Sequence, residues 1–240
     1  MHRQLFIDGE FVDGIDGTTI EVINPHDCSV ITEIAEARAA DVDRAVDAAS
    51  AALPAWRRTN AADRGRLLLK LADALEANAE EFAQLESRDT GHPIKDARLL
   101  DVPRTATCFR YFGGIADKLQ GDVIPVEPGF LNYIQREPLG VVGQIVPWNF
   151  PMMFCAWKMG PALAAGNTVV LKPSELTPLT TLRLAALMNE VGFPPGTFNI
   201  VPGYGHTAGD RLANHPDVRK IAFTGSTATG RAVATKAAQH

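Results

Sequence analysis

Short apolar runs alternate with polar turns over residues 4–34 of the chain. Three Asp-Gly pairs separate these runs, at Asp8-Gly9, Asp13-Gly14 and Asp16-Gly17. An Asp-Gly pair between apolar runs is a strong hairpin signal. The pattern therefore predicts a few short strands joined by hairpins.

From Asp41 the apolar positions recur with helical periodicity. A first helix of about thirteen residues is expected, ending before Pro54, because apolar residues fall at i, i+3, i+4 and i+7 spacings. Its buried face would be formed by Val42, Ala45, Val46, Ala49 and Leu53. A second helix should begin near Thr59 or Asn60, either of which can cap it. Its buried side would carry Leu67, Leu68, Leu71 and Leu75.

Two more helical regions follow before residue 120. Asn78 is expected to cap a short third helix that ends at Asp89-Thr90-Gly91, where Gly91 can adopt the left-handed conformation of a carboxyl-terminal cap. The fourth region runs from about Ile94 to Leu119, and Pro103 predicts an irregularity within it.

Residues 121–138 have a different pattern, because Pro125, Pro128 and Pro138 exclude a helix. Residues 131–136 alternate as a two-sided strand would. We expect an extended hairpin that projects from the body and offers an edge for pairing with another subunit.

Strands and helices alternate from Gly140 onward. Strands are expected over residues 141–146, 168–172, 197–201 and 220–224, and helices over about 152–164, 179–191, 206–214 and from 226. Such alternation is typical of a parallel sheet with right-handed crossovers. Ligands of such sheets bind at the carboxyl ends of the strands.

The composition is that of a globular protein: 240 residues, 46% hydrophobic and a net charge of −5. Acidic and basic residues are interleaved, so neither a nucleic-acid groove nor a basic membrane patch is expected. The apolar stretch 139–171 contains three prolines and Lys158, which favours buried strands and a helix over a membrane span. Three scattered cysteines and an amino terminus without a signal-peptide core indicate a reduced, cytoplasmic setting.

The residues just past the four strands are polar or glycine-rich. They are Val146-Pro147-Trp148-Asn149, Leu171-Lys172-Pro173-Ser174-Glu175, Val201-Pro202-Gly203-Tyr204-Gly205 and Phe223-Thr224-Gly225-Ser226. Lys172, Glu175 and Asn149 would lie where one ligand could touch all three. Gly225 and Ser226 stand between a strand and a helix, where backbone N–H groups favour an anion such as a pyrophosphate. A plain helix cap by Ser226 would have the same local conformation.

Two common nucleotide motifs are missing. The run from Gly203 to Gly209 has one residue too many for G-x-G-x-x-G and follows the third strand, so a tight turn is an equal alternative. The run from Gly225 to Ala232 lacks the lysine and hydroxyl residue of a P-loop, which makes a kinase or ATPase a poor interpretation.

Taken together, three motifs are similar to the aldehyde dehydrogenase superfamily in order and spacing, and the similarity covers nearly the whole chain. They are the run Pro147-Trp148-Asn149-Phe150-Pro151, the run from Lys158 to Glu175, and Phe223-Thr224-Gly225-Ser226. The resemblance implies an α/β fold with an open parallel-sheet, Rossmann-like NAD-binding domain over residues 140–240. Strands and helices of residues 1–120 would pack on it, and the hairpin of residues 121–139 would act as an oligomerisation arm.

The resemblance also implies roles for individual residues. Asn149 would donate its side-chain amide to the oxyanion formed when a nucleophile attacks the aldehyde. Lys172 and Glu175 would hold the adenosine ribose, and Glu175 would repel a 2′-phosphate, so NAD is favoured over NADP. Gly205 and Gly209 would line the adenine side, and Gly225 and Ser226 would meet the pyrophosphate. The other implied cofactor contacts are Val146, Pro147, Trp148, Ser174, Phe223 and Thr224; Trp148 could equally be a core residue.

The nucleophilic cysteine and the general-base glutamate of the family are not recognisable, because the chain ends at His240, before the Glu-Leu-Gly-Gly and Gly-Gln-x-Cys contexts of the family. Cys155 is not expected to replace the nucleophile, since it falls on an apolar helix. The carboxyl-terminal catalytic domain is therefore expected to be absent from this chain. The histidines form no metal-ligand pattern, and solvated side chains are expected for His26, His92, His206 and His215.

Three functions remain open at this point. The first is NAD-dependent oxidation of an aldehyde to a carboxylic acid, by a homo-oligomer (dimer or tetramer) of which this chain is the amino-terminal portion. The second is a catalytically inactive NAD-binding or partner-binding module that associates through the hairpin. The third is a CoA-acylating or phosphorylating semialdehyde dehydrogenase.

Overall fold

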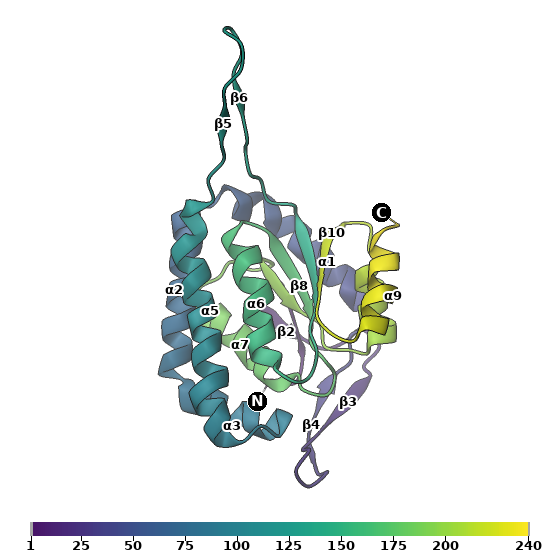
Figure 1. The fold of residues 1–240 in the computed structure, drawn as a ribbon. Coiled ribbons are helices and arrows are strands. Elements are labelled where there is room, and N and C mark those ends of the chain that lie inside the picture. Colours follow the sequence, from purple (N-terminus) through teal and green to yellow (C-terminus); the bar gives the residue numbers. More distant parts are fainter. Residues whose placement is uncertain (1, 240) are drawn as a thin grey trace.

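A six-stranded sheet forms the centre of the molecule in the computed structural model, which describes residues 2–239 (Figure 1). Four strands are parallel and stand in the order β10 (Val218–Phe223), β7 (Val141–Ile145), β8 (Thr168–Lys172) and β9 (Phe198–Ile200). The expected parallel sheet is therefore confirmed. In addition, β1 (Leu5–Ile7) pairs antiparallel with β9, and β2 (Glu10–Val12) pairs with β1 at the edge.

Helices cover both faces of this sheet, which is why its central strands are buried throughout. On one face α6 (Pro151–Ala164) and α7 (Leu179–Val191) belong to a large apolar core with α2 (Ala61–Ala77) and α5 (Val102–Ile115). On the other face α1 (Ala39–Arg58) and α8 (Asp210–Ala213) pack in a second core, and α9 (Thr227–Ala237) lies beside it. No helix among residues 2–239 is both long and apolar enough to cross a bilayer.

The first helix is longer than its periodicity predicts, because α1 begins at Ala39 and continues through Pro54 to Arg58. At its start the Asp41 carboxylate accepts a hydrogen bond from the Arg38 N–H (2.9 Å). Beyond the proline, Trp56 is 1% exposed and its ring centroid lies 6.2 Å from that of Phe193. Burial of this large side chain outweighs the amide hydrogen bond that a proline removes.

The second helix agrees with its sequence signals: Asn60 caps α2 by accepting from the Ala62 N–H (3.0 Å). Its leucines at 68, 71 and 75 are buried, and Leu67 is half-buried. Asn78 stands at the expected N-cap position of α3 (Ala79–Thr90), but its side chain makes no cap hydrogen bond and donates instead to the Ala74 carbonyl at the end of α2 (2.8 Å). Gly91 does end α3 in the left-handed conformation, with φ of 79°.

The fourth helical region breaks before Pro103, as expected, into α4 (Ile94–Asp96), a π-helical turn over Ala97–Asp101, and α5. A proline has no amide donor and crowds the preceding turn, so a wider turn there is a natural accommodation. A 3₁₀ turn over Ala116–Lys118 then leads into the hairpin.

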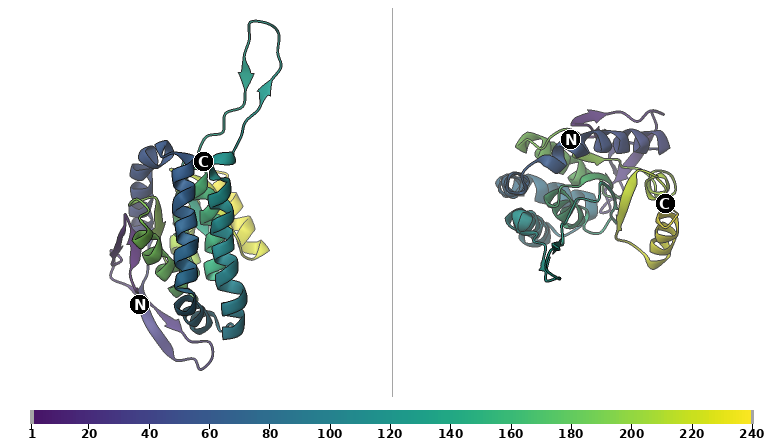
Figure 2. Two further views of the ribbon diagram at one scale, coloured as in Figure 1. Left: turned by 90° about the vertical axis from the view of Figure 1, so that its left-hand side faces the viewer. Right: turned by 90° about the horizontal axis from the view of Figure 1, so that it is seen from above.

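Two smaller sheets lie outside the central one (Figure 2). The first pairs β3 (Thr19–Ile23) with β4 (Val30–Ala35). The second is the expected hairpin, in which only β5 (Val123–Ile124) and β6 (Asn132–Tyr133) pair. Residues 121–137 are all exposed, and the hairpin projects well beyond the body (Figure 1).

Two glycines set the close packing of α2 against α5. A Cβ atom added to Gly65 would lie 2.5 Å from the Gly113 carbonyl oxygen, and one added to Gly113 would lie 2.9 Å from the Gly65 carbonyl oxygen. Both clashes are with backbone, so a side chain at either position would push the helices apart. The neighbouring Gly114 is exposed, and a Cβ atom added there would meet nothing within 4 Å.

Replacing Gly113 by alanine should therefore lower the free energy of unfolding by about 1–3 kcal/mol, as overpacking typically does. The matched control Gly114→Ala should be neutral or stabilise by up to about 1 kcal/mol, because alanine is the better helix former. Urea unfolding followed by circular dichroism measures both. Equal effects of the two substitutions would show that the close approach is not a constraint.

Candidate functional site

The carboxyl ends of four parallel strands lie in one row. In the sheet register Phe223 of β10 pairs with Ile145 of β7, and Ile145 pairs with Lys172 of β8. Leu171 of β8 pairs in turn with Ile200 of β9. Neighbouring strands are about 4.8 Å apart, so the row from β10 to β9 spans roughly 15 Å. The loops that follow these strands therefore open onto a common edge.

Lys172 and Glu175 form an ion pair just past β8, with Nζ 3.1 Å from Oε2. The Lys172 side chain is 5% exposed and that of Glu175 is 27% exposed. Burial lowers the pKa of Lys172, while the Glu175 carboxylate acts in the opposite direction. Within residues 2–239 the ammonium donates one hydrogen bond, to Glu175, which leaves donors for an acceptor at this edge.

The loop after β7 brings Asn149 to the start of α6. The Val146 N–H donates to the Lys172 carbonyl (3.2 Å), which continues the sheet for one residue. The carbonyl of Trp148 accepts from the Thr177 hydroxyl (2.9 Å), while the indole itself is 55% exposed. Pro147 and Asn149 are half-buried, and α6 begins two residues after Asn149. Trp148 is thus a surface residue and not part of the core.

The loop after β10 ends in a helix amino terminus. Thr224 N–H donates to the Ile145 carbonyl (3.1 Å), and its hydroxyl accepts from Lys158 Nζ (2.7 Å). Ser226 caps α9 by accepting from the Thr229 N–H (3.2 Å). A Cβ atom on Gly225 would lie 2.5 Å from the Phe223 ring, so a side chain there would displace that ring.

The loop after β9 is open at Gly205 and closed at Gly209. A Cβ atom added to Gly205 would meet nothing within 4 Å, whereas one added to Gly209 would lie 3.8 Å from Cδ of Lys172. Gly209 therefore stands beside the buried lysine stem. Ser174, also buried, accepts a hydrogen bond from the Leu176 N–H (3.3 Å) and shapes the turn that carries Glu175.

Sequence comparison identifies the family of the chain. The model of the aldehyde dehydrogenase family matches residues 11–240. The chain belongs to the aldehyde dehydrogenase family. It is 52% identical over its whole length to a mitochondrial aldehyde dehydrogenase of Leishmania tarentolae, of which it covers 48%.

Solved structures of aldehyde dehydrogenases have the same fold. The chain matches PnpE from Pseudomonas sp. WBC-3, solved in complex with nicotinamide adenine dinucleotide, with a TM-score of 0.98 and 68% identity over 99% of this chain and 49% of that one. An NAD⁺ complex of the aldehyde dehydrogenase from Bacillus cereus matches with a TM-score of 0.98 and 46% identity, over 100% and 49% of the two chains. The chain spans about half the length of the relatives it matches.

Lys158 was not among the site residues chosen from the sequence, yet the structure brings its ammonium to the β10 loop through Thr224. It lies on α6, where burial lowers its pKa. A single lysine in the middle of a long apolar stretch is the signal that could have identified it, because a half-buried charge needs a partner.

A cluster of Glu86, His92 and Asp101 packs against the loop that carries Asn149. The His92 ring stacks edge-on against Phe150 (centroids 5.0 Å apart), and its Nδ1 lies 2.8 Å from Asp101 Oδ2. Ligand atoms of Glu86, His92 and Asp101 all lie within 4.8 Å of one another. Among the described residues this is the one group whose spacing could suit a metal ion. Burial raises the pKa of Glu86 to about 8, so it is mostly neutral at pH 7 and attracts a cation only weakly.

Two histidines differ from the solvated state expected for them. His92 is 22% exposed and paired with Asp101, and His215 is 4% exposed and accepts a hydrogen bond from the Asp217 N–H (3.2 Å). In both cases residues from other elements, or from the following turn, cover the imidazole ring. The surrounding sequence is polar and gave no sign of this. His26 and His206 are exposed, as expected.

Two of the three cysteines are covered thiols with raised pKa values. Cys155 is fully buried on α6, where burial raises its pKa to about 12. Cys108 is half-buried on α5, and burial raises its pKa to about 11. Cys28 is exposed in the turn between β3 and β4.

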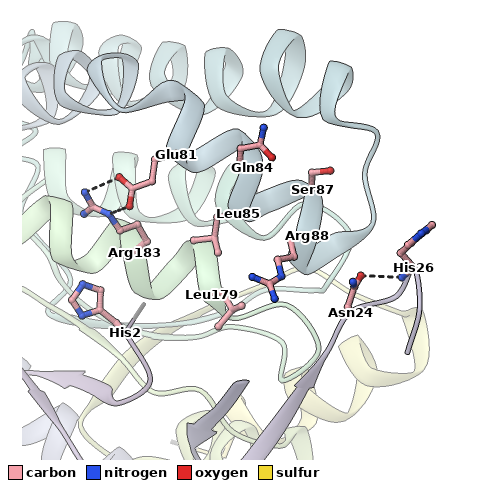
Figure 3. A pocket seen from close by; sticks show the side chains of 10 residues that line it. All are labelled: His2, Asn24, His26, Glu81, Gln84, Leu85, Ser87, Arg88, Leu179 and Arg183. Atoms are coloured by element: carbon pink, nitrogen blue, oxygen red, sulfur yellow. Dashed lines mark hydrogen bonds and ion pairs between the residues drawn. The ribbon is translucent and has the colours of Figure 1, made fainter. Parts of the chain in front are cut away.

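A pocket of about 800 Å³ is lined by side chains of α3, of α7 and of segments near the amino terminus (Figure 3). No residue of the strand-end row lines it. Its charged groups are partly paired already, since Arg183 forms ion pairs with Glu81 and Glu190. We therefore place the functional site at the strand ends and not in this pocket.

Glu86 gives the protein a pH-dependent stability. The folded state keeps this proton up to about pH 8, whereas the unfolded chain loses it near pH 4.5. Between these values the native state binds more protons, so the free energy of unfolding should fall as the pH rises. Urea unfolding of Glu86→Gln at pH 5 and pH 8 should show a smaller fall than the parent protein. An identical fall in both proteins would mean that Glu86 is ionised in the folded state.

Proposed function

We propose that this chain supplies the NAD site and the oxyanion-binding amide of an enzyme that oxidises an aldehyde to a carboxylic acid. The observation that supports this most strongly is the row of strand ends, which places Asn149, the Lys172–Glu175 pair and the Gly225–Ser226 helix start on one edge of the sheet. Two solved relatives carry NAD.

The residues at this edge fit a dinucleotide. Lys172 and Glu175 together offer a donor and an acceptor to the two hydroxyls of a ribose. The open space at Gly205 and the small Gly209 beside Lys172 leave room for an adenine. Two strand spacings away, roughly 10 Å, the N–H groups at the start of α9 can hold a pyrophosphate. Val146, Pro147, Trp148, Ser174, Phe223 and Thr224 would complete the walls of this site.

Glu175 favours NAD over NADP. Its carboxylate accepts hydrogen bonds from a ribose bearing free hydroxyls, while a 2′-phosphate would bring a second negative charge against it. Lys172 does not reverse this preference, because its charge already pairs with Glu175.

Asn149 would act on the aldehyde. When a nucleophile adds to the carbonyl carbon, negative charge develops on the oxygen, and the Asn149 side-chain amide can donate a hydrogen bond to it. The bound NAD would accept the hydride that leaves the same carbon. Burial raises the pKa of the Cys155 and Cys108 thiols, so the thiol nucleophile and the base that activates water would come from the part of the complete enzyme outside this chain.

The complete enzyme is proposed to be a homo-oligomer, a dimer or a tetramer, with the hairpin of residues 121–139 as its arm. The hairpin exposes large apolar side chains, among them Val123, Phe130 and Leu131, each more than 70% exposed. Such side chains on a two-stranded ribbon need a partner surface. Free cysteines throughout are consistent with a reducing, cytoplasmic compartment.

Substituting Asn149 by alanine in the complete enzyme should lower kcat for aldehyde oxidation by about 100- to 1000-fold, the usual loss for one oxyanion donor. The Kd for NAD should change little, because the amide acts on the substrate. NADH absorbance and calorimetry provide the two measurements. Asn189→Ala, at an exposed asparagine on α7, is the matched control and should change neither. A kcat preserved in Asn149→Ala would contradict the assigned role.

A further inference from the structure

A mostly apolar groove runs along the surface between α5 and α6. It has a volume of about 690 Å³ and is lined by Arg104, Thr107, Cys108, Tyr111, Phe112 and Trp157. Tyr111 and Trp157 are 61% and 51% exposed. Among these lining residues Arg104 carries the only charge, since burial keeps the Cys108 thiol neutral by raising its pKa to about 11.

The groove starts at the same end of the molecule as Asn149. The two helices run parallel, because Asp101, just before α5, reaches Phe150 through His92, and Phe112 further along α5 lies against Gly160 of α6. Both helices therefore begin at the strand-end side of the sheet (Figure 1). Arg104 is three residues beyond Asp101, which places its Cα about 5 Å along the helix axis from Asp101, the residue that pairs with the His92 ring next to Phe150.

A series of aromatic rings connects Asn149 to the groove. Phe150 follows Asn149 directly and packs edge-to-face on Phe154 (centroids 6.2 Å apart). Phe154 packs in the same way on Trp157 (5.3 Å), which lines the groove. An aldehyde held at Asn149 can extend its tail over this aromatic surface.

Arg104 has no ion-pair partner among residues 2–239, which sets it apart from its neighbours on the same helices. Arg110, on α5 as well, pairs with both Asp73 and Glu76 of α2. Arg98, just before α5, pairs with Glu80. An unpaired guanidinium at the rim of an apolar groove is a binding element for an anion.

We propose that Arg104 binds a carboxylate at the far end of the aldehyde substrate, so that the preferred substrates are aldehydes bearing an acid group on an apolar tail. This inference rests on the proposed function, because it assigns the tail of the molecule whose aldehyde group meets Asn149. One guanidinium matches one carboxylate with two parallel hydrogen bonds. The groove contains no second cation for a doubly charged phosphate.

Two probe aldehydes test the proposal in the complete enzyme: para-carboxybenzaldehyde and its methyl ester, which differ in charge at one end. The parent enzyme should oxidise the acid with the higher kcat/KM. Arg104→Gln should lower kcat/KM for the acid by about 10- to 100-fold, mainly through KM, and change that for the ester less than about threefold. Arg104→Lys should restore part of the activity on the acid, because it keeps the charge but not the bidentate geometry.

Arg44→Gln is the control for the loss of one positive charge. Arg44 is exposed on α1, which covers the opposite face of the sheet. It should leave the preference for the acid unchanged. Equal losses on both probes in Arg104→Gln would overturn the proposal and show a structural role for Arg104. If the parent enzyme oxidises neither probe nor any simple aldehyde, the proposed function fails instead.

Discussion

The register of four parallel strands is the constraint on which the site depends. Hydrogen bonds between β10, β7, β8 and β9 align Phe223, Ile145, Lys172 and Ile200 at one edge of the sheet. A parallel strand can rejoin its sheet only after a crossover, here made by α6, α7 and α8, so every crossover returns the chain to the opposite edge before the next strand begins. The loops at the carboxyl ends are therefore adjacent although they are about 25 residues apart in sequence.

Burial on both faces holds this register in place. The central strands are covered by two separate apolar cores, and a slip of one residue would turn each strand's core side chains to the wrong face. The close approach of α2 and α5 at Gly65 and Gly113 extends the larger core outward from the sheet. In the opposite direction, β1 and β2 pair onto β9 and cover what would be an exposed edge. The central strands β7 and β8 are thus covered on both faces, and the loops of the strand-end row follow from their carboxyl ends.

Several polar side chains are buried next to the site, and most of them are held in place by an ion pair or a hydrogen bond. Burial lowers the pKa of Lys172, and the neighbouring Glu175 carboxylate opposes this effect. Lys158 is held by the Thr224 hydroxyl, and the His92–Asp101 pair lies beneath Phe150. Glu86, by contrast, has no hydrogen-bond partner for either carboxylate oxygen among the described residues and therefore favours its neutral form. The site thus combines the Lys172–Glu175 ion pair at the strand ends with the buried, mostly protonated Glu86 nearby.

The sequence predicted most of the elements but few of their long-range partners. Periodicity placed the strands and helices from Val141 to Ala237 within a few residues, because strands and helices alternate there between clear turn signals. It failed at Pro54, where burial of Trp56 outweighed local preference. It placed Asn78 correctly at the start of α3 but not its side chain, which bonds to the preceding helix. The strand-end position of Lys172 and Glu175 could be predicted from the topology of a parallel sheet. The environments of His92 and His215 could not, because their neighbours come from other parts of the fold.

The central claim is that the Lys172–Glu175 pair binds the adenosine ribose of NAD. Calorimetric titration of the complete enzyme with NAD and with NADP tests it most directly. The parent enzyme should bind NAD more tightly than NADP, and Glu175→Gln should weaken NAD binding by about 10-fold or more while NADP binding changes little or strengthens. Glu21→Gln, at an exposed carboxylate on β3, should change neither affinity. An unchanged affinity for NAD in a folded Glu175→Gln variant would contradict the account.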